Sequence, residues 1–136
     1  MPKQSPVAND LDRPYWEACN EERLVLQHCT SCDRNQYPPE AKCRACGSDS
    51  FTWNEVEGKG TIYSFGVIYD TPIALLQPEQ PYNCAVVQLD ADPEINFMSH
   101  LPGTPVDEVP IGAKVEITWE TTPGNGQKVP EWRVVS

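Results

Sequence analysis

The strongest constraint in this sequence is a set of four cysteines in two closely spaced pairs. Cys29 and Cys32 form one C-x2-C pair and Cys43 and Cys46 form the other, with ten residues between the pairs. Two residues between cysteines let both sulfurs of a tight knuckle face one point, and two knuckles complete a tetrahedral site. We therefore expect one structural Zn²⁺ held by four thiolates, with an iron centre on the same ligands as the alternative.

A closed four-cysteine site has no open coordination position, so this metal is expected to stabilise the fold and not to activate water. His28 precedes the first cysteine and could replace a ligand, but its neighbour already fills that role. Gly47 is expected to supply the turn of the second knuckle. Basic residues beside the knuckles could offset the charge of the site: Arg34, Lys42 and Arg44.

Short elements on both sides of the cysteines indicate a helix followed by a zinc ribbon. Asp12 before Arg13-Pro14 is typical of a helix start with a carboxylate cap, and Asn20 is a suitable end. Strand candidates at residues 23–28 and 51–56 flank the two knuckles. We predict a flexible arm over residues 1–11 and a helix plus zinc ribbon over residues 12–57.

The composition changes after Gly58-Lys59-Gly60, where strand candidates follow one another without helical periodicity. Five such strands suit an OB-type barrel better than a sandwich, which usually needs about seven. The predicted fold is thus mainly β: a short helix and zinc ribbon, then a five-stranded OB-fold barrel over residues 58–136. The strand candidates are residues 61–69, 82–89, 95–101, 114–120 and 131–135.

The charge balance limits the possible partners. Twenty acidic and ten basic residues give a formal net charge of −10, which repels phosphate backbones. No apolar stretch approaches the ~20 residues of a membrane span, and residues 1–10 carry no secretory signal. We therefore expect a cytoplasmic protein that binds neither nucleic acid nor membrane, and whose cysteines do not form a disulfide framework.

The sequence contains few groups for catalysis. It has two histidines and neither a G-x-S-x-G elbow nor a Walker loop, and Gly58-Lys59-Gly60 is too short to cradle a phosphate. Cys84 and His100 lie on strand candidates that could be neighbours, which would allow a thiolate–imidazole pair. The alternative is a buried cysteine and an edge histidine that never meet, and we favour it. We predict no catalytic residue in this chain.

An apolar, proline-bracketed connection follows the first barrel strand. Residues 72–78 place Ile73, Leu75 and Leu76 between two strands, where they would either fill the core or form an interface or ligand channel. We favour a partner or ligand surface. The acidic connection over residues 102–110 is a second, weaker candidate.

Taken together, these motifs resemble the zinc-ribbon/OB-fold family, of the domain of unknown function 35 type, that accompanies thiolase-superfamily enzymes in acyl-CoA metabolism. The likeness covers residues 12–135. Asp33 departs from the family pattern, in which glycine is frequent after the first knuckle, and leaves open whether the turn there has the usual form. The matching residues are Tyr15-Trp16, residues 29–32, Tyr37-Pro38-Pro39, residues 43–48, residues 58–65 and residues 111–115.

The resemblance implies a non-catalytic accessory subunit, stabilising a thiolase-like partner in a two-plus-two hetero-oligomer and sharing its acyl-CoA site. The partner would supply the nucleophile, base and oxyanion hole. The resemblance implies that it is a thiolase, acyltransferase, hydroxymethylglutaryl-CoA synthase or retro-aldolase of lipid, steroid or aromatic degradation. Two alternatives remain. One is an independent acyl-CoA-binding module. The other is a single-stranded nucleic-acid-binding barrel, disfavoured by charge, that would stack bases on Tyr63, Phe65, Phe97 and Trp132.

Overall fold

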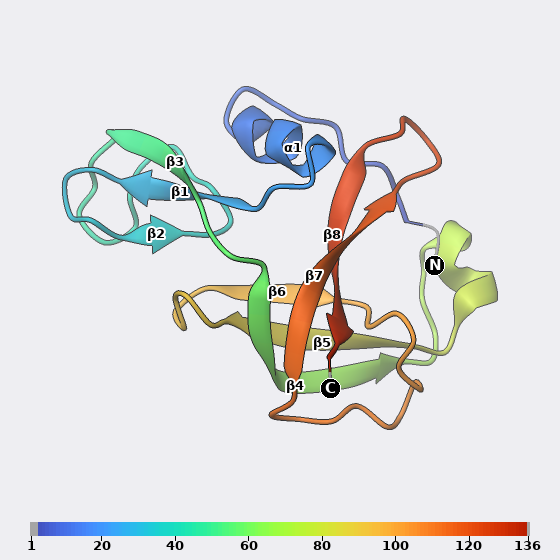
Figure 1. Ribbon diagram of the computed structural model, residues 1–136. Coiled ribbons are helices and arrows are strands. Elements are labelled where there is room, and N and C mark those ends of the chain that lie inside the picture. Colours follow the sequence, from blue (N-terminus) through green and yellow to red (C-terminus); the bar gives the residue numbers. More distant parts are fainter. Residues whose placement is uncertain (1–2, 136) are drawn as a thin grey trace.

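The computed structural model describes residues 3–135 as a mainly β chain with one α-helix near its N-terminus (Figure 1). Met1 and Pro2 of the predicted arm, and Ser136 at the end of the predicted barrel, lie outside the described residues. In chain order the elements are α1 (Arg13–Asn20), β1 (Val25–Cys29), β2 (Asn35–Gln36), β3 (Phe51–Glu55), β4 (Lys59–Ile68), the 3₁₀-helix η1 (Ala74–Glu79), β5 (Tyr82–Leu89), β6 (Asn96–Ser99), β7 (Lys114–Thr121) and β8 (Lys128–Val134).

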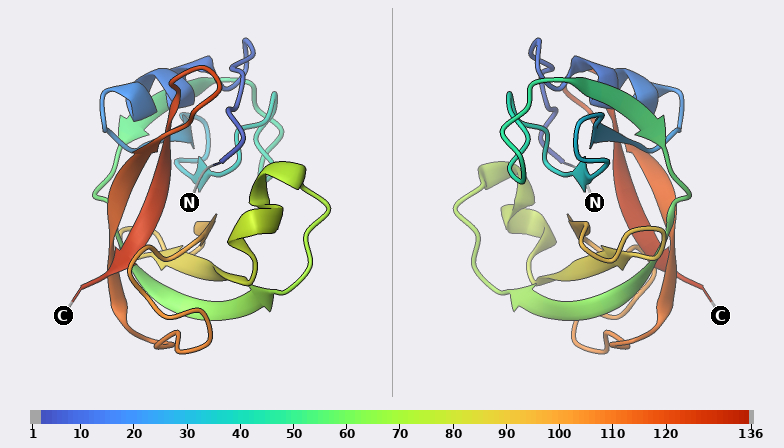
Figure 2. Two further views of the ribbon diagram at one scale, coloured as in Figure 1. Left: turned by 90° about the vertical axis from the view of Figure 1, so that its right-hand side faces the viewer. Right: turned by 90° about the vertical axis from the view of Figure 1, so that its left-hand side faces the viewer.

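The strands form two antiparallel sheets. A three-stranded sheet of order β2-β1-β3 carries the cysteines, and a five-stranded sheet of order β6-β5-β4-β7-β8 curves into a nearly closed barrel (Figure 2). The predicted fold class is therefore confirmed. Sequence reasoning missed β2 and η1, because β2 has only two residues and η1 has no apolar periodicity.

Helix α1 begins as predicted, with Pro14 in its first turn, but its cap differs from the expectation. The Asp12 carboxylate does not cap the helix; it accepts a hydrogen bond from the backbone N–H of Asn9, upstream of the helix (2.8 Å). At the other end, the Asn20 side chain accepts a hydrogen bond from the backbone N–H of Lys128 on β8 (3.0 Å). This bond attaches the helix to the barrel.

One hydrophobic core joins the two halves of the chain. A row of aromatic rings runs from α1 through the ribbon into the barrel. The centroids of consecutive rings are 5.6 Å apart for Tyr15–Tyr37, 4.4 Å for Tyr37–Phe97 and 5.6 Å for Phe97–Trp132. Phe97 lies on β6 and Trp132 on β8, and both are buried. The ribbon thus packs on the barrel through aromatic side chains and does not form a core of its own.

Glycine allows close packing in the middle of the barrel. Gly60 lies on β4 between Leu89 of β5 and Val115 of β7, where a Cβ would come within 2.5 Å of the Val87 side chain. A Cβ on Gly58 would come within 2.1 Å of Ile117. The two glycines of the glycine-lysine-glycine segment therefore allow close packing at the start of the barrel.

Candidate metal centre

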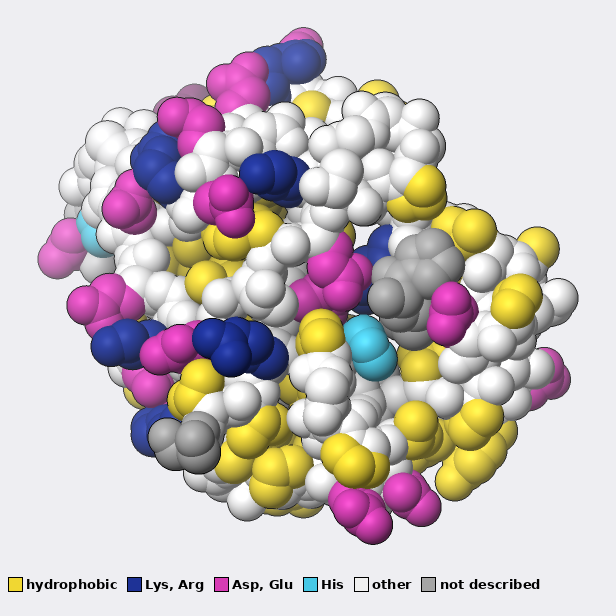
Figure 3. Space-filling model, turned by 45° about the vertical axis from the view of Figure 1, so that its right-hand side comes forward, with side chains coloured by type: hydrophobic (Ala, Val, Ile, Leu, Met, Phe, Trp, Pro, Cys, Tyr) yellow, Lys and Arg dark blue, Asp and Glu magenta, His cyan; other side chains and the backbone are white. Residues whose placement is uncertain are grey.

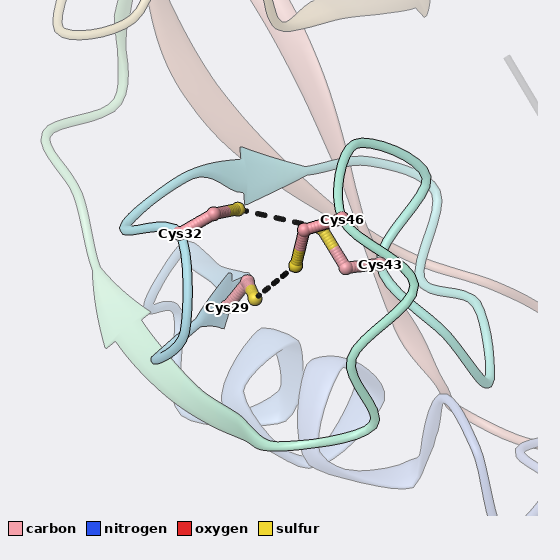
Figure 4. A group of neighbouring side chains, drawn as sticks. All are labelled: Cys29, Cys32, Cys43 and Cys46. Carbon is pink, nitrogen blue, oxygen red and sulfur yellow. Dashed lines mark hydrogen bonds between the residues drawn. The ribbon is translucent and has the colours of Figure 1, made fainter.

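The four cysteines of the two pairs converge on one point (Figure 4). Their sulfurs all lie within 4.8 Å of one another, and the pairs Cys29–Cys46 and Cys32–Cys43 are both 3.6 Å apart. Zn–S bonds of about 2.3 Å in a tetrahedron place sulfurs about 3.8 Å apart, whereas a disulfide needs about 2.05 Å. The separations fit one zinc ion, so the predicted ligand set is brought together as a zinc-binding group.

The two knuckles have the same backbone form. In the first, the N–H of Asp33 donates to the carbonyl of Cys29 (2.9 Å), and in the second the N–H of Gly47 donates to that of Cys43 (2.8 Å). Asp33 and Gly47 both have positive φ, 63° and 77°. Asp33 therefore gives the first knuckle the same left-handed turn that Gly47 gives the second.

Backbone N–H groups in the knuckles favour thiolates at the first cysteine of each pair. The N–H of Cys46 lowers the pKa of Cys43 to about 6, and the N–H of Cys32 lowers the pKa of Cys29. Burial raises the pKa of Cys32 to about 12. The sulfurs would not all ionise without a compensating cation, and zinc supplies that charge by holding all four as thiolates.

His28 supports the site from outside and is not among its ligands. Its Nε2 lies 2.8 Å from Asp33 in the first knuckle, and its Nδ1 lies 2.8 Å from the Asn35 side chain. Asn35 in turn donates to the carboxylate of Asp92, between β5 and β6 (3.1 Å). This chain of polar contacts connects the first knuckle with the barrel.

Two buried glutamines that sequence reasoning missed hold the second knuckle in place. The Gln36 amide donates to the Gln27 side chain (2.6 Å), and its oxygen accepts from the N–H of Arg44 (3.1 Å). Gln27 also donates to the carbonyl of Glu40 (2.8 Å). Arg44, one of the basic residues that could offset the charge of the site, forms an ion pair with the Glu40 carboxylate at 3.6 Å. Both glutamines lie on strands next to the cysteines, which is the signal that could have identified them.

Cys84 and His100 lie at neighbouring positions of β5 and the end of β6, one step beyond the paired residues Ala85 and Ser99. Burial raises the pKa of the Cys84 thiol. Burial and the positive charge of Lys3 lower the pKa of His100 to about 4. Both shifts favour the neutral forms, which is the opposite of what a thiolate–imidazolium pair requires.

The three predicted surface residues of the apolar connection after β4 differ in how far they are exposed. Leu76 packs inward and is buried, Ile73 is half-buried, and Leu75 has 42% of its surface exposed. Leu75 lines a hollow of about 560 Å³ together with residues of the N-terminal arm and of the β7–β8 hairpin. Of the three, Leu75 presents the open apolar surface.

The aromatic residues considered for base stacking are unevenly placed. Phe97 and Trp132 are buried with at most 3% of their surface exposed, so they cannot stack on bases. Tyr63 points outward from β4 with 67% exposed, and Phe65 packs partly against the core. No helix among residues 3–135 is long and apolar enough to cross a bilayer.

Comparison with known families agrees with this geometry. Residues 16–52 match the family described as "ChsH2, rubredoxin-like zinc ribbon domain", and residues 53–120 match "ChsH2, C-terminal OB-fold domain". A rubredoxin-like zinc ribbon joined to an OB-fold barrel is thus the class of protein defined by this fold and metal centre. The chain belongs to the ChsH2 family of such proteins, also classed as DUF35, which confirms the predicted resemblance.

Individual relatives extend the comparison. A solved chain described as "Ltp2-ChsH2(DUF35) aldolase" superposes with a TM-score of 0.81 at 28% identity, covering 96% of this chain and 98% of that one. A DUF35 protein of unknown function from Sulfolobus solfataricus gives a TM-score of 0.61 at 17% identity, covering 90% of this chain and 83% of that one, and shows the fold alone.

A curated relative from Thermomonospora curvata is named "Probable enoyl-CoA hydratase alpha subunit". It is 35% identical over 115 residues, which cover 82% of this chain and 34% of the relative. This chain therefore spans about a third of the length of that relative.

Proposed function

We propose that this chain is a non-catalytic zinc subunit of a hetero-oligomeric enzyme that acts on acyl-CoA thioesters. Its partner would be a thiolase-superfamily chain, in a two-plus-two assembly that makes or breaks a carbon–carbon bond in the manner of an aldolase. The observation that carries the proposal is the match, over nearly the full length of both chains, to a chain from an aldolase described as Ltp2-ChsH2(DUF35).

The chemistry of the residues supports an accessory role. A zinc ion bound by Cys29, Cys32, Cys43 and Cys46 would be coordinatively saturated, so it has no position for substrate or water. The neutral forms of Cys84 and His100 give no activated nucleophile. In this proposal the partner supplies the nucleophile, the base and the oxyanion hole, and the present chain stabilises it and helps to shape the acyl-CoA site.

Co-expression with a thiolase-like chain encoded beside this one tests the proposal. We expect the two to co-purify in equal amounts, and the cleavage or condensation of acyl-CoA to require both. A Cys43→Ser variant should lose both zinc and co-purification, whereas a Cys84→Ser variant should retain both. A partner that is fully active alone and never co-purifies would overturn the proposal, as would turnover of a thioester by this chain in isolation.

A second candidate function is an independent acyl-CoA-binding module. The observation that favours it is a cavity of about 370 Å³ between α1 and β8, within the usual size range of ligand sites. The net charge of −10 opposes the phosphates of CoA, which is why this candidate ranks second. Calorimetry of the isolated chain with acyl-CoA distinguishes the two, because micromolar binding would favour the module.

A further inference from the structure

A buried carboxylate on β8 pairs with an amine from the N-terminal arm. The Glu131 side chain is only 2% exposed, and its Oε1 forms an ion pair with the ammonium of Lys3, a residue whose side chain is 25% exposed. Its second oxygen accepts a hydrogen bond from the Ser99 hydroxyl (2.7 Å). Burial raises the pKa of Glu131, and the Lys3 charge opposes that shift. Both carboxylate oxygens are therefore satisfied, one of them by a residue 128 positions away in the sequence.

This pair lies at the open seam of the barrel. β6 and β8 are the two edge strands of the five-stranded sheet, and side chains bridge them where no strand ladder does. The Ser99 hydroxyl of β6 accepts the N–H of Trp132 on β8 (2.9 Å) in addition to contacting Glu131. Lys3 therefore adds the third component of a polar bridge across the seam.

A second anchor holds the same arm to the barrel. The Ser5 hydroxyl contacts the Thr122 hydroxyl (2.8 Å) and accepts the N–H groups of Gly124 (3.0 Å) and Asn125 (3.1 Å) in the β7–β8 hairpin. The Asn125 side chain donates to the carbonyl of Pro6 (3.1 Å). A Cβ on Gly124 would come within 2.7 Å of the Ser5 hydroxyl, so the hairpin has a backbone shape that fits the arm.

The arm also forms one side of the 370 Å³ cavity. Residues 3–6 face aromatic side chains from α1, the ribbon, β6 and β8 across it. Figure 3 shows acidic, basic and histidine side chains gathered at the hollow of this face. Aromatic walls beside a buried carboxylate favour an ammonium group. The aromatic side chains are Tyr15, Trp16, Tyr37, Phe97 and Trp132.

We propose that residues 3–6 are a strap that closes the barrel, and that Glu131 with Ser99 forms a binding site for a primary ammonium group, occupied by Lys3 as an internal ligand. This inference is independent of the proposed partner and reaction. Its physical basis is that removing the amine leaves a buried charge without a partner, which is costly. The strap therefore reinforces the side-chain bridge between β6 and β8 at the place where the sheet itself is not closed.

A double-mutant cycle on the full zinc-loaded chain tests the ion pair. We expect Lys3→Met to raise the unfolding equilibrium constant by about tenfold or more. The same change in a Glu131→Gln background should alter it less than about twofold, since the buried charge is gone. Lys59→Met is the matched control, because Lys59 is 60% exposed and lies 4.0 Å from Glu57. Equal effects of the two lysine substitutions would overturn the proposal.

Chemical rescue tests the ligand class. Millimolar n-butylammonium should restore stability to Lys3→Met by filling the vacated site, and n-butanol should not. The Lys3→Met/Glu131→Gln double variant should not respond to the amine. Equal responses to amine and alcohol, or equal responses of the single and double variants, would contradict an ammonium site.

An NMR titration tests the seating of the strap without relying on stability. His100 is one of two histidines, and the Lys3 charge lowers its pKa. Lys3→Met should therefore raise the pKa of His100, and Lys59→Met should not. An unchanged His100 titration in Lys3→Met would show that the strap is not seated in solution.

Discussion

Asp33 occupies in the first zinc knuckle the position that Gly47 occupies in the second. Both residues have positive φ, and each donates its N–H to the carbonyl of the first cysteine of its own pair. This conformation is unfavourable for most side chains and only mildly so for aspartate. Asp33 also contacts His28 at 2.8 Å, so it combines a turn with a polar contact that glycine could not make.

We expect Asp33→Gly to retain zinc and to change the free energy of unfolding by less than about 1 kcal/mol, because relief of backbone strain offsets the lost contact. Asp33→Val should destabilise the chain by about 1–2 kcal/mol, since a β-branched residue is poorly accommodated at positive φ. Chemical denaturation of the zinc-loaded variants measures both. Asp33→Asn, which keeps a short polar side chain, is the control, and a valine variant as stable as the asparagine variant would refute this reading.

Gly60 is predicted to tolerate a larger side chain poorly, for steric reasons. Gly60→Ala should cost about 1–3 kcal/mol, because its Cβ would lie within 2.5 Å of Val87 and 2.9 Å of the Gln88 carbonyl. Gly66 lies on the same strand with nothing within 4 Å of a Cβ, so Gly66→Ala should be nearly neutral. Thermal unfolding of the two variants provides the comparison, and similar losses in both would contradict the packing argument.

Zinc removal should unfold the ribbon first. Structural zinc contributes on the order of 10 kcal/mol, comparable with the whole stability of a small domain. We expect one zinc per chain by elemental analysis. Chelation should accelerate amide exchange in β1 and β3 and, because Tyr37 packs on Phe97, weaken β6 next. A chelated chain with unchanged protection in β1 would contradict the metal's structural role.

His100 should make stability fall in mild acid. Its pKa is lowered to about 4 in the folded chain from an ordinary 6.5, so the unfolded chain binds an extra proton between these values. The resulting contribution of His100 to the free energy of unfolding is present above pH 6.5 and is lost as the pH falls towards 4. It amounts to up to about 2 kcal/mol after allowance for partial exposure. Urea unfolding of the wild type and His100→Gln at several pH values isolates it. If the free energy of unfolding depends on pH in the same way in the wild type and in His100→Gln, this contribution is excluded.

Leu75 and Leu76 are adjacent in η1 but should respond differently to substitution. Leu76→Ala should destabilise the chain by about 2–3 kcal/mol because it empties a buried site. Leu75→Ala should change stability by less than about 0.5 kcal/mol, since 42% of Leu75 is exposed. If Leu75 contacts the proposed partner, Leu75→Asp should weaken co-purification while leaving the isolated chain stable. Full co-purification of Leu75→Asp would remove this residue from the proposed interface.

Local sequence patterns predicted much of the fold. The cysteine spacing specifies a knuckle by itself, because two intervening residues leave few backbone paths that bring both sulfurs to one point. Successive strand candidates without helical periodicity predicted the barrel strands, and the structure shows alternating burial in one of them, Tyr82–Leu89. The two-residue strand Asn35–Gln36 could not be found this way, because it forms only through pairing with Gln27 and His28.

The sequence by itself determined the zinc ligands, the mainly β class and the order of ribbon and barrel, because each depends on residues close together in the chain. Only the tertiary structure decided how the two halves share a core, that Leu76 and not Leu75 is buried, and that Lys3 meets Glu131. These relationships join residues far apart in the chain, or depend on which face of a segment packs inward. Such contacts depend on packing and on the cost of leaving a buried charge without a partner. Neither can be inferred from a short stretch of sequence.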